Sequence, residues 1–147
     1  MRFATIFLLC AFFTQVFSAQ EQPSGPTDEK AKKTYKEAMD DLRQHRTLWA
    51  LDAFKKADKQ DGGHCAACRQ NLIKYGIQIQ EWKFAQEVAE EAIAQATGDD
   101  VALAHYDLGI VFMSEAMAKH KDELFQRAHD EMTKAIAAHE NFPKAVY

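Results

Sequence analysis

The residues of this chain best suited to chemistry are two cysteines three positions apart, Cys65 and Cys68, with His64 directly before them. Positions i and i+3 share one face of a helix, and at a helix start the backbone N–H groups lower the pKa of a thiol. Four interpretations follow: a local disulfide, two unpaired thiols in the core, a metal site that includes His64, and a redox-active dithiol. A local disulfide is the first expectation in an oxidising compartment.

The sequence around this motif argues against cofactor chemistry. Covalent haem attachment requires a histidine directly after the second cysteine, and Arg69 stands there. A metal site needs a fourth ligand, which the spacing around His64 does not supply. Thioredoxin-type enzymes begin their active helix after a β-strand, and no strand pattern precedes Cys65. We therefore expect neither a metal nor a cofactor.

The other titratable residues form no catalytic arrangement. Carboxylates are expected to pair with nearby lysines and to cap helices. No Ser-His-Asp arrangement, phosphate-binding glycine loop or dinucleotide fingerprint can be assembled, so we expect a protein without a catalytic site. The histidines are scattered, and we expect all six on the solvated surface: His45, His64, His105, His120, His129 and His139.

The composition limits which kinds of secondary structure can position these residues. The chain has 147 residues, 47% of them apolar and 27% charged, which fits one globular domain. Its 18 basic and 22 acidic residues give a net charge of −4, which argues against a dedicated nucleic-acid binder. The three prolines, Pro23, Pro26 and Pro143, lie near the ends. Long helices are therefore favoured over a β fold with many tight turns.

The N-terminus has the pattern of a secretory signal peptide. Arg2 precedes an eleven-residue run, Phe3–Phe13, that is apolar except for Thr5. We predict a signal peptide over residues 1–18 with cleavage after Ser18. A membrane anchor is the alternative, but the run is short of the roughly 20 residues that a spanning helix needs. We expect an exported protein in a bacterial periplasm, or alternatively a secreted one, with no further apolar stretch of membrane length.

Residues 19–26 contain two prolines and no large apolar side chain, so we predict a flexible linker there. A helical domain follows over residues 27–147, with Thr27 as the first N-cap. We expect six helices of about 13 to 20 residues, joined by breaks so short that neighbouring helices are antiparallel. The expected breaks lie near His45–Arg46, Asp61–Gly63, Gln80–Glu81, Gly98–Asp100, His120–Lys121 and Glu140–Asn141.

Small residues recur at similar offsets in the three helical hairpins. The spacing is twelve and then seven residues in the first two hairpins, and nineteen and then seven in the third. The third hairpin therefore carries two extra helical turns. A small side chain on each helix lets two backbones approach closely. The positions are Ala38, Ala50 and Ala57, then Ile73, Ala85 and Ala92, then Gly109, Ala128 and Ala135.

Two segments carry a resemblance to a known family. Trp49–Ala57 resembles the second-helix pattern of the tetratricopeptide repeat, and Tyr106–Gly109 resembles its first-helix pattern. The chain departs from that pattern at Ile73, where glycine or alanine is usual, and at Gly76, where an aromatic residue is usual. The resemblance implies an all-α fold, an α-hairpin solenoid of three helix-turn-helix repeats with the start of a fourth at Asn141–Tyr147. A generic helical bundle is the alternative.

The resemblance also implies a function. A non-catalytic, exported scaffold would bind a peptide or a partner protein in a concave groove, with self-association through an uncapped C-terminal end as a further expectation. The alternative is the repeat segment of a larger periplasmic, thioredoxin-like redox protein. The implied groove residues are Tyr35, Met39, Leu42, Arg43, Gln70, Lys74, Ile77, Gln78, Tyr106, Ile110, Met113 and Ser114.

Overall fold

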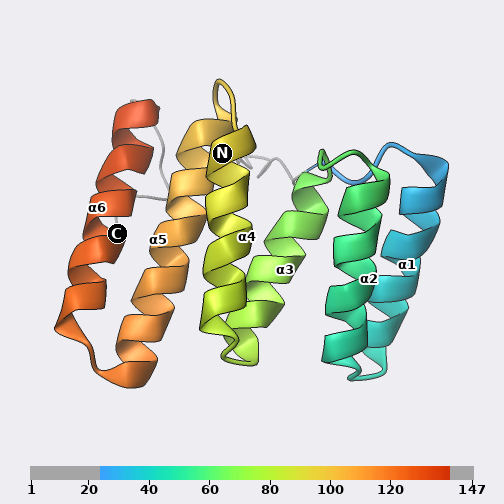
Figure 1. Ribbon diagram of the computed structural model, residues 1–147, viewed down its shortest axis with the longest axis horizontal. Coiled ribbons are helices and arrows are strands. Elements are labelled where there is room, and N and C mark those ends of the chain that lie inside the picture. The colour runs from blue at the N-terminus through green and yellow to red at the C-terminus, as the bar shows by residue number, and fades with distance from the viewer. Residues whose placement is uncertain (1–23, 140–147) are drawn as a thin grey trace, which may run out of the picture.

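The computed structural model describes residues 24–139, which form six α-helices and no β-strand (Figure 1). The all-α class and the predicted helix breaks within these residues are confirmed. The predicted signal peptide, residues 19–23 of the linker and the start of a fourth repeat lie outside the described residues. The helices are α1 (Glu29–Arg43), α2 (Thr47–Gln60), α3 (Ala66–Gln78), α4 (Trp82–Gln95), α5 (Asp100–Lys119) and α6 (Asp122–Ala138).

The helices stand side by side in a row, and each packs against the next one in the sequence (Figure 1). In addition α3 contacts α5, so that α3, α4 and α5 pack together as a group. The last two helices have 20 and 17 residues, whereas the first four have 13 to 15. The two extra turns expected in the third hairpin therefore lengthen both of its helices.

Each hairpin turn contains one non-glycine residue in the left-handed conformation. These residues are His45, Gln80 and His120, with φ of 58°, 62° and 53°. A side chain in this conformation costs roughly 1–2 kcal/mol, so the same strained geometry is used to close each pair of helices. The three turns are thus alike in backbone although no glycine marks them in the sequence.

The small residues lie where the helices approach one another. Eight of the nine positions are buried, and the ninth, Ala92, is half-buried. A Cβ atom at Gly109 would lie 3.0 Å from Met132 Cε and 3.3 Å from the Ala128 carbonyl oxygen. One at Gly76 would lie 3.3 Å from Ala85 Cβ. Glycine at both places allows the two helices of a hairpin to approach this closely.

The first helix is capped by Asp28, and the prediction of Thr27 as the N-cap is wrong. The Asp28 carboxylate accepts hydrogen bonds from the backbone N–H groups of Lys30 and Ala31, both at 2.9 Å. Thr27 instead donates its N–H and its hydroxyl to Asp61 Oδ1 at 2.7 and 3.0 Å. The hydroxyl of Thr27 thus contacts Asp61, the C-cap residue of α2, and the negative charge of Asp28 suits the helix start.

The described end of the predicted linker, Ser24–Pro26, is attached to the helices rather than free. Pro26 is buried, and the Ser24 carbonyl accepts a hydrogen bond from the backbone N–H of Ala67 at 3.0 Å. The first N–H groups of a helix have no partner within it, so α3 offers this donor to the passing chain. Asp61 adds a second attachment, because its Oδ1 also accepts the Asp28 N–H at 2.8 Å.

Removal of the Asp61 carboxylate is expected to loosen the N-terminal segment. Burial raises the pKa of this carboxyl, but the hydrogen bonds from Asp28 and Thr27 outweigh burial, so its pKa lies below the ordinary 3.8. Asp61→Ala should lower the free energy of unfolding by about 2 kcal/mol at pH 7, measured by urea denaturation. A group with a lowered pKa stabilises the fold fully above its unfolded value, so the loss should shrink as the pH falls below 3.8. Asp52→Ala, at an exposed position of α2, is the control and should have little effect at either pH.

Among the described residues, α5 has the length and composition of a membrane span, contrary to the expectation of no further such stretch. Its mean hydropathy is 1.2 over an 18-residue window. In the structure α5 contacts α3, α4 and α6. It also carries the buried Glu115, which accepts hydrogen bonds from Gln86 of α4 and from Lys119. In the structure 44% of that window is buried, and a helix covered by several neighbours is apolar over much of its surface.

Candidate functional site

Cys65 and Cys68 form a disulfide at the start of α3, with their Cα atoms 5.2 Å apart. Both residues are 0% exposed and pack with Ala57 and Ala67. The Cys65 N–H donates to Asp58 Oδ1 at 3.1 Å, and burial raises the pKa of that carboxyl. Of the four interpretations of the motif, the structure contains the local disulfide. Sulfur atoms bonded to each other are not thiolate ligands, so this form holds no metal with His64.

The buried disulfide is expected to resist reduction. A thiolate must reach a sulfur atom to break the bond, and neither cysteine is exposed in the folded chain. We expect dithiothreitol to reduce the bond slowly while the chain is folded, as followed over time by alkylation and mass spectrometry. The same protein in urea serves as the control and should be reduced much faster. Equally fast reduction of the folded and the urea-unfolded protein would instead show that the sulfur atoms are accessible to an attacking thiolate.

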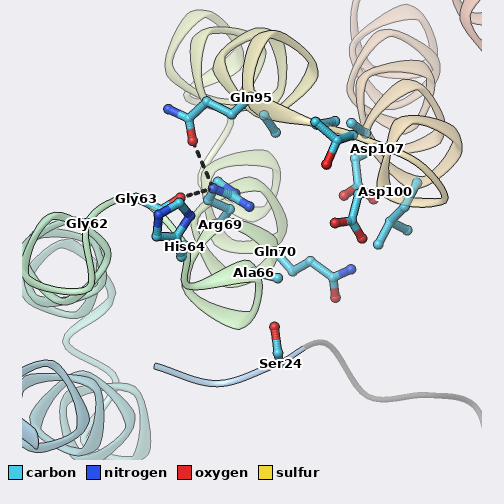
Figure 2. Close-up of a pocket in the computed structure, with 15 residues that line it drawn as sticks. Ser24, Gly62, Gly63, His64, Ala66, Arg69, Gln70, Gln95, Asp100 and Asp107 are labelled. Atoms are coloured by element: carbon cyan, nitrogen blue, oxygen red, sulfur yellow. Dashed lines mark hydrogen bonds between the residues drawn. The ribbon is translucent and has the colours of Figure 1, made fainter. Parts of the chain in front are cut away.

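A cavity of about 630 Å³ is bordered by His64, Ala66 and Arg69, the sequence neighbours of the two disulfide-bonded cysteines (Figure 2). It is bordered by the loop between α2 and α3, by parts of α3, α4 and α5, and by Ser24 of the N-terminal segment. This volume is in the range of sites that bind small molecules or short peptide segments. The apolar part of its wall consists of small and medium side chains: Ala66, Ala92, Ala96, Leu103 and Ala104.

Basic and acidic side chains border the cavity on different sides. Arg69 and His64 lie at the start of α3, while Asp100 and Asp107 come from α5 (Figure 2). Arg69 is held in place because its Nη1 donates to the Gly63 carbonyl and to Gln95 Oε1, the latter at 3.1 Å. The cavity therefore has a basic side whose guanidinium has a defined position and an acidic side with two carboxylates.

Most of the predicted groove residues contribute to packing between helices. The seven apolar or aromatic ones are half-buried and lie against the core clusters of the hairpins. Tyr35 is an example: its ring packs edge-on against Phe54 at 5.2 Å, and its hydroxyl accepts a hydrogen bond from Asn71 Nδ2 at 3.1 Å. The seven are Tyr35, Met39, Leu42, Ile77, Tyr106, Ile110 and Met113.

The five polar groove residues are more accessible. Arg43, Lys74 and Gln78 are exposed, and Gln70 and Ser114 are half-buried. Of the twelve predicted residues, Gln70 is the one that borders the cavity. The structure thus brings Gln70 together with residues that the sequence did not assign to a site.

Sequence reasoning missed Arg69, Gln95, Asp100 and Asp107 as neighbours in a cavity. Asp107 belongs to the quoted Tyr106–Gly109 segment and Arg69 follows Cys68, but no spacing rule relates residues on three different helices. Their proximity depends on how α3, α4 and α5 pack.

The expectation that all six histidines are solvated is wrong for His105. Its side chain is only 17% exposed, and Nδ1 lies 2.7 Å from Glu131 Oε2 on α6. Burial raises the pKa of Glu131, but hydrogen bonds from Lys134 and His105 lower it by more, so its pKa lies below the ordinary value. This pair links α5 to α6.

In comparisons with known proteins, no family model matches the chain, and neither a curated protein nor a solved structure is detectably similar to it. The resemblance to the tetratricopeptide family therefore rests on the quoted segments and the spacing of small residues.

Proposed function

We propose that this chain is a non-catalytic, exported scaffold of tetratricopeptide-like hairpins that binds a peptide or a partner protein. Binding would take place on the face formed by the first helix of each hairpin, α1, α3 and α5. One observation carries this proposal: a cavity of about 630 Å³ is bordered by both α3 and α5, together with the end of α4 and the loop before α3, and combines an apolar wall with a few polar groups. Sites that bind ligands commonly have this composition.

Exposed polar residues on the first helices support the same assignment. Arg43 on α1 and Lys74 and Gln78 on α3 are exposed, so their side chains are available to a ligand that lies across the helices. Amide and charged groups of this kind fix the position and direction of an extended peptide or a helix. Because α3 contacts α5, the face is continuous from the second hairpin to the third.

Charge reversal on this face tests the proposal. The variant Arg43→Glu with Lys74→Glu should lose partners that the original protein retains from a periplasmic extract, because both positions reverse charge on the binding face. The matched control is Lys56→Glu with Lys83→Glu, which changes the same charge at exposed positions of the second helices α2 and α4. Unchanged partners in the first variant, or equal losses in both, would exclude the first helices as the binding face.

A further inference from the structure

We propose that the cavity bordered by α3, α4 and α5 binds a short peptide segment that carries charges of both signs. The carboxylate of the segment would lie at Arg69 and His64, and its ammonium or guanidinium group at Asp100 and Asp107. This inference rests on the proposed function, because it assigns a ligand class to one part of the binding face. It is carried by the separation of the charges across one cavity (Figure 2).

The basic side of the cavity is arranged for a carboxylate. The two hydrogen bonds from Arg69, to Gly63 and to Gln95, both use Nη1. The N–H groups of Nε and Nη2, which together can bind a carboxylate in a bidentate manner, take part in neither of these two bonds. Arg69 also acts electrostatically on Asp58 of α2, and its positive charge opposes the rise that burial causes in the pKa of that carboxyl. His64 borders the cavity on the same side, and the start of α3 adds the positive end of a helix dipole.

The acidic side is formed by a single helix. Asp100 lies in the first turn of α5, and Asp107 lies seven residues further on, which places both on the same side of the helix. Figure 2 shows both side chains on the α5 side of the cavity, opposite Arg69. Two carboxylates on one helix face attract a cation and repel a phosphate, so a nucleic acid or an anionic lipid surface fits this side poorly.

The region between the two charged sides can hold a peptide backbone. Its wall carries short side chains such as Ala66, Ala92 and Ala104, which leave room for a chain to pass. Gln70 extends from α3 toward the α5 side of the cavity, and in Figure 2 its amide lies between Ser24 and Asp100, where it can both donate to and accept from a backbone amide. A cavity of about 630 Å³ has room for a few residues of an extended segment.

Four blocked tetrapeptides test this assignment. Two of them carry both charges: acetyl-Glu-Gly-Gly-Lys-amide and the peptide of reversed sequence, acetyl-Lys-Gly-Gly-Glu-amide. The other two are relatives with a single charge, in which either Glu or Lys is replaced by Gln. Titration into the ¹⁵N-labelled protein, followed by NMR, should move the amide signals of residues that border the cavity. We expect the better of the two doubly charged peptides to bind roughly three- to tenfold tighter than either singly charged relative.

The protein variants separate the two sides. Arg69→Gln should remove the advantage that the glutamate gives, while Asp100→Asn with Asp107→Asn should remove the advantage that the lysine gives. Arg69→Lys keeps the charge but not the bidentate geometry, and it should retain part of the effect. Asp130→Asn, at an exposed position of α6, is the control and should bind all four peptides as the original does. Thermal unfolding of each variant checks that it is folded. If the double variant is not folded, Asp100→Asn alone serves in its place, because Asp100 is exposed.

Equal affinity for all four peptides, or signal changes away from the cavity, would overturn the inference. Its failure differs from a failure of the proposed function. If partner capture depends on Arg43 and Lys74 while the charged peptides bind no better than the others, the binding face stands and this ligand class is wrong. If the peptides bind as expected while capture ignores Arg43 and Lys74, the cavity stands and the wider face is wrong.

Discussion

Phe54→Ala is expected to lower the free energy of unfolding by about 3–5 kcal/mol, as for other fully buried phenylalanines. Phe54 is 0% exposed and packs against residues of the first hairpin and against Leu72 of α3. Its ring also lies 5.2 Å from that of Tyr35 in an edge-on arrangement, which alanine cannot replace. Since the first and second hairpins meet around this side chain, the cavity left behind weakens both the hairpin and its contact with the next one. Urea denaturation measures the loss.

Trp49→Ala is the matched control for this change. Trp49 lies on the same helix and has a larger side chain, but it is 69% exposed. Its ring makes a cation–π contact with the guanidinium of Arg46, whose Cζ lies 5.9 Å from the ring centroid. Its removal should cost less than about 1 kcal/mol. Similar losses for the two variants would show that the core between the first two hairpins does not depend on Phe54.

Gly109→Leu is expected to lower the free energy of unfolding by about 3 kcal/mol through overpacking. The Cβ atom alone would lie 3.0–3.2 Å from Met132 side-chain atoms and 3.3 Å from the Ala128 carbonyl oxygen. The end of Met132 can move, but the carbonyl belongs to the backbone of α6, so a branched side chain must push the two longest helices apart. Urea denaturation measures the loss. A lower midpoint with an unchanged m-value would show that only the stability of the fold has changed.

Two further variants isolate the effect of close approach. Gly109→Ala should change the free energy of unfolding very little. The higher helix propensity of alanine stabilises α5 by about 1 kcal/mol, and this offsets the cost of the tight contact with α6. Ala118→Leu adds a large side chain at an exposed position of the same helix and should leave stability within about 0.5 kcal/mol. If Gly109→Leu is as stable as Ala118→Leu, α5 and α6 do not require a small residue at their contact.

The helices could be read from the sequence because their causes are local. A proline-free stretch, apolar residues at helical spacing and short polar breaks depend on neighbouring residues only, and the structure has its helices between those breaks. The repeat of small residues also indicated which helices pair, since two helices approach closely only where Cβ atoms are absent or small. Local signals were weaker for capping, where Thr27 and Asp28 are adjacent and both suitable. The contact of Thr27 with Asp61, 34 residues away, decided between them.

The groove was predicted less well than the helices. The resemblance assigned twelve residues to one surface, but it could not distinguish side chains that face a ligand from those that fill the space between hairpins. That distinction depends on how closely each pair of helices packs. Helix packing places residues such as Tyr35 and Ile77 against the core and leaves Arg43 and Lys74 exposed.

The sequence by itself determined the class of the fold, the positions of the helix breaks and the residues that let helices meet. Only the tertiary structure decided that Cys65 and Cys68 are bonded and buried, and that Arg69 faces Asp100 and Asp107 across a cavity. The physical reason is the range of the interactions. Helix formation is governed by residues within a few positions of each other, whereas a cavity is the space left by side chains from several helices, which depends on every packing contact around it.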